Sequence, residues 1–480
     1  MRYEDFSLAA SDAHPGDWFG YTVCIDDNIA VVGAPGHDGV GLQAGAAYIF
    51  RRSDISGWTE EAVLFEPNGS EFDLFGTAVG VSGDRVIIGV PGAEMGRGAV
   101  YVYHHSLSHG WQEEATLVAS DRSTSAEFGE ALSIDGGWIL IGAPGHTDYS
   151  GAAYIFRLTA DGTWIEDAKL MPSKREEYTF FGHTVSLDCD VAVVGADHTI
   201  SGPSLRGSVY IYRRSNEGAW SEEDRLRAWN ENDLDFFGCS ICVNHDRLLV
   251  GSMQDPEGSL PGYAYLWVYQ QGIGWQPQQR LEAYDGEQRD EFGSSVSIDG
   301  RTAIIGSCWD DDNGTSSGSA YVFHLTDGQW REQEKLIASD GQRLDWLGEY
   351  CSVSKSSALI ASRMNDSSAG KVYGYDDISP LSLALEGECP GNIRCTIFGA
   401  DPDDRLVVLY GTQQGKTEAL PYCPDLFINI AIPIVAAVGL ADTMGELTVT
   451  GKVPGKACGR LIVQGVNLTT CEKTKATLLE

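Results

Sequence analysis

The sequence predicts an all-β fold, a seven-bladed β-propeller with four antiparallel strands per blade, followed by a small β-sandwich-like domain. Two observations predict it. An aromatic-glycine pair opens an apolar run six times and a Leu-Gly pair does so a seventh time, and successive glycines are 53 to 56 residues apart. Each interval also repeats four short β-rich segments separated by polar turns. A period of this length with four strands per unit is typical of a propeller blade. The pairs are Phe19-Gly20, Phe75-Gly76, Phe128-Gly129, Phe181-Gly182, Phe237-Gly238, Phe292-Gly293 and Leu347-Gly348.

Each unit supplies its strands in the same order. The first follows the glycine as an alternating stretch such as GHTVSLD, and the second is an apolar run such as IAVVGAPG. The third, as in GAAYIF, joins small, β-branched and aromatic residues, which suit a pleated and half-buried surface. The fourth begins with tryptophan and continues with acids, as in GWTEEAVL at Trp58. We therefore expect every unit to form one four-stranded blade.

The seventh unit ends near Tyr375 and has no fourth strand after it. The chain begins with YEDFSLAASD, which matches the fourth-strand pattern EEATLVASD of the second unit. We therefore expect residues 3–8 to complete the last blade. This pairing of the two ends of the repeat region removes a sheet edge that would otherwise be exposed.

Two units combine the Phe-Gly pair with Gly-Ala-Pro, at Gly33-Ala34-Pro35 and Gly142-Ala143-Pro144. Through these paired motifs residues 3–375 resemble the FG-GAP repeat family, whose best-known members form the seven-bladed head of integrin α subunits. The long period and the tryptophan-led fourth strand are closer to the bacterial version of the repeat. We interpret the later replacements of Gly-Ala-Pro as loss of the motif with retention of the fold. These replacements are Gly195-Ala196-Asp197, Gly251-Ser252-Met253, Gly306-Ser307-Cys308 and Ala361-Ser362-Arg363.

The composition changes after Tyr375, so we divide the chain into a propeller at 1–375, a linker at 376–385 and a C-terminal domain at 386–480. Runs such as RLVVLYG and RLIVQGVNL in the last segment alternate like strands of a small sandwich. The segment is similar to C-terminal modules of large secreted bacterial proteins. Its cysteine density suits disulfides in an oxidising compartment, with at least one thiol left unpaired within the segment. These cysteines are Cys389, Cys395, Cys423, Cys458 and Cys471.

The propeller carries most of the negative charge. The formal net charge is −36, and the residues after 375 contribute only 13 acids and 8 bases. Such a field argues against nucleic acid and anionic membranes as partners and favours cationic ligands or divalent metals. The longest apolar run, 427–440, contains Pro433 and is too short to span a bilayer, so we expect no membrane insertion. We expect a monomer.

The cellular location is predicted from composition. The chain leads from Met1 directly into a predicted strand, without a signal peptide. We nevertheless expect a secreted or cell-surface protein whose leader has been removed or missed; a cytosolic protein is the less favoured alternative. In the propeller, Cys24, Cys242 and Cys351 take innermost-strand positions where other units have small or apolar residues, and we expect them to be buried free thiols.

Alternating strand directions place the fourth-to-first and second-to-third connections on one face of the propeller, called here the loop face. Aspartates recur two residues before the Phe of the pair, at Asp17, Asp73, Asp235, Asp290 and Asp345, and we expect them to hydrogen-bond their own turns. The second-to-third loops differ from unit to unit, and variable loops on a rigid scaffold commonly bind ligands. Aromatic side chains near this face are suited to stack on sugars or anchor a protein. The candidate ligand-binding residues are Trp18, His37, Asp38, His146, Asp148, Trp309 and Trp346.

Metal binding is a separate question. His37 and His146, with Asp38 and Asp148, are either a transition-metal site or polar loop residues. No unit has the Asp-x-Asp-x-Asp-Gly calcium loop of integrin-type repeats. The loop at 309–314 offers oxygen ligands from Asp310, Asp312 and Asn313, so it is either a calcium site or a solvated acidic loop. No other cofactor is required.

Two classes of function remain. We predict a non-catalytic extracellular binding or adhesion protein, not an enzyme, whose loop face engages a protein or a glycan. The alternative is a propeller enzyme of the glycan hydrolase or lyase type, with acids at the central opening. Gly314-Thr315-Ser316-Ser317-Gly318 matches the nucleophile-elbow string but lacks its strand-turn-helix context, and we find no carboxylate pair that the repeat places outside its turns. Convergence of acids and histidines from different blades in one pocket would favour the enzyme.

Overall fold

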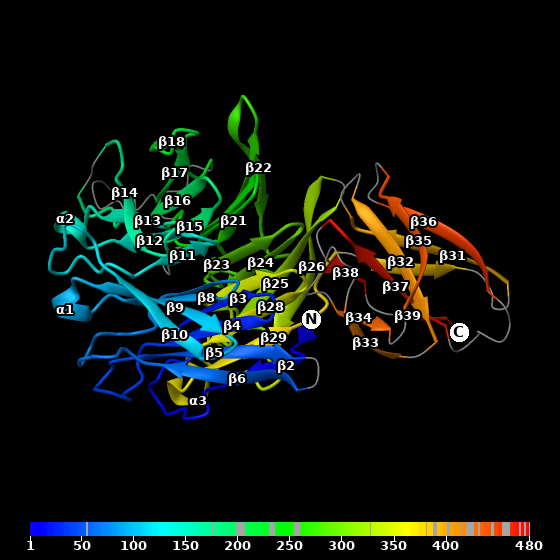
Figure 1. Cartoon of the computed structure of the whole chain (residues 1–480), viewed down its shortest axis with the longest axis horizontal. Helices are drawn as coiled ribbons and strands as arrows, with labels where there is room; N and C mark the ends of the chain where they lie inside the picture. The colour runs from blue at the N-terminus through cyan, green and yellow to red at the C-terminus, as the bar shows by residue number, and fades with distance from the viewer. Residues whose placement is uncertain are drawn as a thin grey trace.

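The structure is a computed structural model (Figure 1). It describes residues 1–480 apart from several short segments. In the first 375 residues these are 54–55, 175–176, 198–206, 230–235, 254–259 and 327. After residue 375 they are 381, 387–390, 401–403, 413, 419–426, 431–432, 443–445, 454–460, 470–471, 475–476 and 480.

Seven sheets, each with four consecutive antiparallel strands or with three such strands and one from the N-terminus, form the first part of the chain. The first three sheets are β3 (Thr22–Asp26), β4 (Ile29–Ala34), β5 (Ala46–Ser53), β6 (Gly57–Leu64); β7 (Val79–Ser82), β8 (Arg85–Val90), β9 (Ala99–Ser106), β10 (Gly110–Leu117); and β11 (Leu132–Asp135), β12 (Trp138–Ala143), β13 (Ala152–Leu158), β14 (Trp164–Leu170). The next two are β15 (Thr184–Asp188), β16 (Val191–Ala196), β17 (Ser208–Arg214), β18 (Trp220–Leu226); and β19 (Ile241–Asn244), β20 (Arg247–Ser252), β21 (Tyr263–Gln270), β22 (Gly274–Leu281). The last two are β23 (Phe292–Asp299), β24 (Thr302–Ser307), β25 (Ser319–Thr326), β26 (Gln329–Ile337); and β27 (Cys351–Ser354), β28 (Ser357–Ser362), β29 (Lys371–Tyr375).

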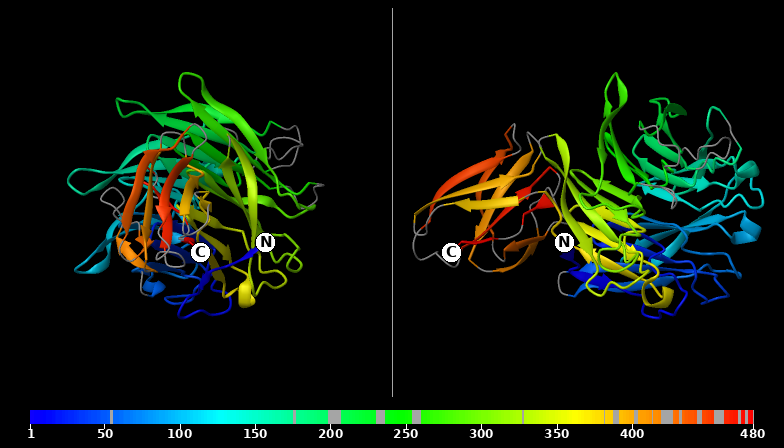
Figure 2. Two further views of the ribbon diagram at one scale, coloured as in Figure 1. Left: turned by 90° about the vertical axis from the view of Figure 1, so that its right-hand side faces the viewer. Right: turned by 180° about the vertical axis from the view of Figure 1, so that it is seen from behind.

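The sheets are arranged around an axis as the blades of a propeller (Figure 2), and the contacts between their first strands place these strands innermost. Each innermost strand contacts the next in the series β3, β7, β11, β15, β19, β23, β27, and β27 contacts β3. The core lies between neighbouring sheets. Phe19, for example, is fully buried and packs edge-on against Tyr48 of its own sheet, with ring centroids 5.3 Å apart, in a cluster that also includes Val372 of the seventh. Because the core fills the space between sheets, the second strand of a blade, such as β4 or β16, is buried on both of its faces.

Side-chain hydrogen bonds link the innermost strands at their ends. The carboxylate of Asp26 accepts a hydrogen bond from the Gly83 amide of the next blade at 2.7 Å, and Asp299 accepts one from Lys355 at 2.6 Å. The hydroxyl of Ser354 accepts one from the Asp27 amide at 3.2 Å, which joins the seventh sheet to the first. The other blades repeat this bond, with Ser82, Asp135, Asp188 and Asn244 as acceptors. The short polar side chains that read as turn residues therefore also hold adjacent blades together.

The N-terminal segment contributes to two sheets. β1 (Arg2–Tyr3) pairs in parallel with β26 of the sixth sheet, and β2 (Phe6–Leu8) pairs antiparallel with β29 of the seventh. The prediction for residues 3–8 therefore agrees with a fourth strand at β2. Glu4 accepts hydrogen bonds from the amide and hydroxyl of Ser339, as Glu166 of a true fourth strand does from Ser120.

The loop face carries the second-to-third connections. Three of them contain a four-residue helical segment, at α1 (Ala93–Gly96), α2 (His146–Tyr149) and α3 (Asn365–Ser368). Four of the aspartates that precede the Phe-Gly pairs each accept a hydrogen bond from the amide three residues before, as expected; these are Asp17, Asp73, Asp290 and Asp345. Asp235 lies outside the described residues. No helix in the described part of the chain is long and apolar enough to cross a membrane.

The residues after 375 form further strands beside the propeller (Figure 1). Two sheets pack on each other through residues such as Ile397, Val408 and Val463. Cys395 is buried and free, while the other four cysteines of this segment lie outside the described residues, as does the predicted disulfide pairing. The strands are β30 (Ser382–Glu386), β31 (Gly391–Phe398) and β36 (Leu447–Val453) in one sheet; β32 (Arg405–Gly411), β35 (Ile434–Leu440), β37 (Leu461–Asn467), β38 (Glu472–Lys473) and β39 (Thr477–Leu479) in the other; and the pair β33 (Gln414–Glu418) and β34 (Phe427–Ile430).

Candidate functional site

The tyrosine of the third strand holds the loop face in place. The Tyr48 hydroxyl donates to Asp12 in the preceding fourth-to-first loop at 2.7 Å, and Tyr154 donates to Asp121 at 2.7 Å. The same pair recurs as Tyr321 with Asp285 and as Tyr373 with Asp340. The loops next to the Phe-Gly pairs are therefore anchored to the blades.

The two candidate histidines lie in different blades, each against such an anchor. His37 Nε2 is 3.5 Å from Asp12, and its Nδ1 accepts the Gly39 amide at 2.9 Å. His146 Nε2 lies 3.3 Å from Asp121. The Asp38 carboxylate accepts a hydrogen bond from the Gln43 amide within its own loop, and Asp148 is exposed. The structure does not bring these residues together. His37 and Asp38 instead line a cleft of about 500 Å³ at the rim of the first blade.

The acidic loop of the sixth blade already contains a cation from the protein itself. The ammonium of Lys335, 5% exposed, lies 2.7 Å from Asp310 and 3.0 Å from Asp285, and it also pairs with Asp312. Asn313 donates its amide to the Ala338 carbonyl. Burial alone would lower the pKa of Lys335, but its bonds to Asp310 and Asp312 raise it above the ordinary value. This geometry argues against calcium at Asp310, Asp312 and Asn313, because a lysine takes the place of the ion.

The three candidate tryptophans lie at or beside the central axis of the propeller. The rings of Trp309 and Trp346 pack with centroids 6.4 Å apart, and both line a cavity at the centre of the propeller. Trp18 lies next to it, with its ring 6.4 Å from that of Tyr21. Of the predicted ligand-binding residues, these are the ones that the structure brings to one place.

The axial cavity has a volume of about 550 Å³ and is lined by all seven innermost strands. The residue that follows the glycine of the Phe-Gly pair reaches this cavity in every blade. Because the blades are related by the repeat, one sequence position produces a ring of seven side chains at one level. They are Tyr21, Thr77, Glu130, His183, Cys239, Ser294 and Glu349.

A second repeat position supplies more of the lining. The first three blades have proline at the third position of Gly-Ala-Pro or, in the second blade, of Gly-Val-Pro. At this position the later blades place Asp197, Met253 and Cys308 on the cavity wall, and Arg363 of the seventh blade pairs with the wall residue Glu349. The later blades therefore keep the fold without the motif, as predicted. The replacements introduce polar and soft side chains at the axis.

One side of the cavity holds an ion pair between the fourth blade's two variable positions. His183 Nδ1 lies 3.0 Å from the carboxylate of Asp197, whose side chain is 2% exposed. The Asp197 carboxylate raises the pKa of His183 to about 9. Glu130 of the third blade lies on the same wall, and burial raises its pKa although the charge of His183 opposes this shift.

The seventh and first blades form an aromatic wall around a second ion pair. Arg363 Nε lies 2.6 Å from Glu349, and its guanidinium lies 5.0 Å from the ring centre of Tyr21 and 5.5 Å from that of Trp346. The rings of Tyr21 and Tyr350 are 5.9 Å apart. Burial raises the pKa of Glu349.

A fourth carboxyl group at the cavity belongs to Glu291, immediately before the sixth Phe-Gly pair. It is 8% exposed, and its Oε2 accepts a hydrogen bond from the Cys308 thiol at 3.4 Å. Burial raises its pKa to about 7. All seven residues at this repeat position have a positive φ, a conformation that costs a non-glycine residue about 1–3 kcal/mol and clusters at functional sites. They are Trp18, Leu74, Glu127, Phe180, Phe236, Glu291 and Trp346.

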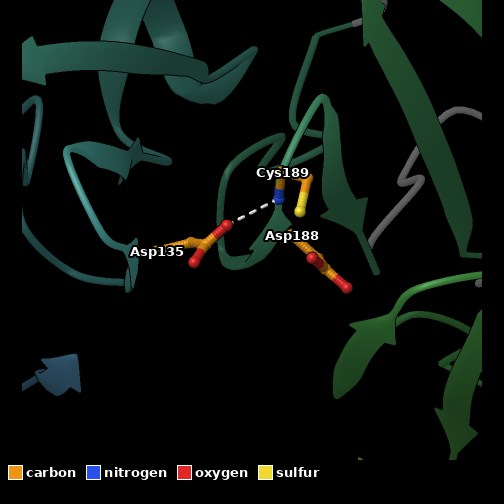
Figure 3. A group of neighbouring side chains, drawn as sticks. All are labelled: Asp135, Asp188 and Cys189. Carbon is orange, nitrogen blue, oxygen red and sulfur yellow. Dashed lines mark hydrogen bonds between the residues drawn. The ribbon is translucent and has the colours of Figure 1, made fainter. Parts of the chain in front are cut away.

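A different group has the spacing of metal ligands and lies at the ends of the innermost strands β11 and β15 (Figure 3). Asp135, Asp188 and Cys189 have ligand atoms within 4.8 Å of one another, the only such group among the described residues. The Asp135 carboxylate accepts the Cys189 amide, which is the inter-blade bond found around the ring. A hydrogen bond to Asp188 raises the pKa of Cys189 to about 12, which disfavours a metal-bound thiolate. We interpret the group as part of the blade contacts.

The sequence alone did not identify the axial residues. Glu130 and Glu349 share one repeat position, and Glu127 and Glu291 share another. Both positions belong to the turn that leads into the innermost strand, so these carboxylates do not contradict the expectation that the repeat places its acids in turns. The sequence did contain a signal for the axial residues. They keep a fixed place beside the Phe-Gly pair, but their residue type changes from blade to blade.

The fold and this cavity define a β-propeller with a polar axial cavity whose lining varies around a fixed scaffold. A protein-family model described as the FG-GAP repeat matches residues 4–50, 58–103, 111–156, 164–212, 275–323 and 330–375. These matches cover more than half of the chain, which therefore belongs to the FG-GAP repeat family. Each match runs from one fourth strand through the first three strands of the next blade.

Proposed function

We propose that this chain is a non-catalytic extracellular binding protein whose ligand, a glycan or a protein segment, enters the axial cavity from the loop face. The observation that carries the proposal is the convergence of Trp309, Trp346 and the seven residues after the Phe-Gly pairs on one cavity of about 550 Å³. Binding sites commonly combine a concave apolar surface with a few placed polar groups, as here.

Two further features support the proposal. FG-GAP repeats form propellers that often mediate binding, which makes recognition the first expectation for this family. The net charge of −36 keeps such a protein soluble and disfavours nucleic acid as the partner. We expect the protein to act as a monomer at the cell surface or after secretion.

Replacing Trp346 with alanine should weaken ligand binding by about tenfold or more, because buried aromatic anchors at the centre of a binding surface commonly contribute more than 1 kcal/mol. The ligand would first be found by screening the purified chain on glycan and surface-protein arrays. Calorimetry would then compare the two proteins.

The matched control is Trp111→Ala, which removes a half-buried tryptophan from the outer strand β10, far from the axis. It should leave the affinity unchanged. Normal binding by Trp346→Ala together with weakened binding by Trp111→Ala would place the ligand on the outer strands and contradict the proposal.

One observation favours the alternative of a propeller enzyme. Glu130, His183 and Glu291 of three blades converge on the cavity with shifted pKa values, the pattern of acid-base groups in active sites. Prolonged incubation with each glycan that binds, followed by chromatography of the products, separates the two functions. Cleavage that is lost in Glu130→Gln or Glu291→Gln would establish the enzyme, and intact glycan supports the binding protein.

A further inference from the structure

We propose that the axial cavity recognises a ligand carrying a positively charged amino group, with the carboxylates of Glu130 and Glu291 supplying the opposite charge. This inference rests on the proposed function and narrows the ligand to one chemical class. It follows from the charge balance of the cavity, the hydrogen bonding of the two carboxylates and the aromatic wall.

The cavity has an excess of negative charge. Four carboxyl groups line it, and two of them are paired with cations: Asp197 with His183, and Glu349 with Arg363. No ion pair joins Glu130 or Glu291 to a basic side chain in the described part of the chain. A bound cation would balance these two charges, whereas an anionic ligand would add to the repulsion.

The same two carboxyl groups lack hydrogen-bond donors. The Glu130 side chain accepts no hydrogen bond from a described residue, and Glu291 accepts one only from the weak thiol donor of Cys308. Buried polar groups are nearly always hydrogen-bonded, so such groups call for a partner. An ammonium has three donors and no acceptor, which suits carboxylates better than it suits any other lining group.

The aromatic wall is also suited to a cation. The guanidinium of Arg363 already lies against the rings of Tyr21 and Trp346, so this wall accepts positive charge within the protein itself. Trp309 and Tyr350 extend the aromatic surface along the cavity. Contacts of this kind strengthen the recognition of an organic cation.

Two matched pairs of probes test the proposal and distinguish the two possible sources of the amino group. Glucosamine is compared with N-acetylglucosamine, and the free ε-amine of N-acetyl-lysine amide is compared with its Nε-acetylated form. In both pairs acetylation removes the charge. We expect at least one amine to bind, and its acetylated partner to bind about tenfold more weakly or worse, by calorimetry and ligand-observed NMR. The pair that responds identifies an amino sugar or a lysine side chain as the source.

The double variant Glu130→Gln with Glu291→Gln should lose the preference for the amine. Its matched control, Glu217→Gln, makes the same change at an exposed hairpin position and should bind as the natural protein does. Because no ion pair joins either carboxylate to a basic side chain among the described residues, and the only positive charge that acts on Glu130 is that of His183, their neutralisation should change the stability of the fold little, and thermal denaturation checks this.

Acidification is expected to weaken the binding of the amine. The groups that face Glu291 are the thiols of Cys308 and Cys239 and the carboxylate of Glu349. As the pH falls through about 7, Glu291 takes up a proton and the cavity loses a negative charge. The lysine derivative keeps its charge throughout, so its affinity should fall between pH 8 and pH 6 in the natural protein and change less in Glu291→Gln.

Equal binding of the charged and acetylated partners, amine binding that survives in the double variant, or no binding of either amine at millimolar concentration would overturn the amino-group proposal. None of these outcomes contradicts the proposed function. That proposal fails only if Trp346→Ala binds the ligand from the array screen with unchanged affinity.

Discussion

Replacing Gly76 with alanine is expected to destabilise the propeller by about 2–4 kcal/mol, because two costs combine. The residue has a φ of +94°, which L-residues rarely adopt. A Cβ there would also lie 2.3 Å from the carbonyl oxygen of Ala46 and 3.2 Å from the amide of Ala34. Both neighbours are backbone atoms of paired strands, so they cannot move aside without breaking the sheet. Chemical denaturation of the variant and the natural protein measures the effect.

The matched control is Gly83→Ala, in the β7–β8 turn of the same blade. Gly83 also has a positive φ, +54°, but nothing lies within 4 Å of its added Cβ. This variant should lose only about 1 kcal/mol, the cost of the backbone conformation. Equal destabilisation by the two substitutions would show that the close approach of the neighbouring backbone does not determine the need for glycine in the Phe-Gly pair.

Lys335→Met should destabilise the protein by about 3–5 kcal/mol at pH 7, because it leaves buried carboxylates without their cation. Asp310 is 2% exposed and lies 2.7 Å from the lysine ammonium, and Asp285 and Asp312 contact the same group. Acidification neutralises carboxylates, so the difference between variant and natural protein should shrink as the pH falls toward about 4. Denaturation curves at several pH values measure both effects.

The control for this prediction is Lys371→Met in the seventh blade. Lys371 pairs with Asp340 at 2.6 Å, but its side chain is 23% exposed and that of Asp340 is 49% exposed. Exposed pairs contribute only about 0.2–1 kcal/mol. A loss of comparable size in both variants would mean that burial of the Lys335 cluster is not the source of its stability.

The sequence was sufficient to predict the repeat, the strand order within a blade and the pairing of β2 with β29. Each of these depends on local patterns, such as alternation and turn residues, that recur in every unit and so reinforce one another. The aspartates at the ends of the innermost strands stand at the polar turns that the sequence predicts, but their bonds to the next blade depend on tertiary packing.

The axial site was beyond sequence reasoning for a physical reason. Glu130, His183 and Glu349 are separated by 53 residues or more along the chain, and only the packing of the blades around an axis brings them to one cavity. The lysine that occupies the predicted calcium loop is likewise distant, since Lys335 belongs to β26 and Asp310 to the β24–β25 loop. In contrast, Trp309 and Trp346 were predicted to lie near the loop face because they sit next to the motif, and both line the axial cavity.

A crystal structure of the protein with the ligand from the array screen tests the axial cavity most directly. If the ligand binds in the axial cavity, we expect its density inside the propeller, against Trp346 and within hydrogen-bond distance of Glu291 or Glu130. Density at the rim of the first blade, in the cleft beside His37, with the axial cavity holding only solvent, would contradict it.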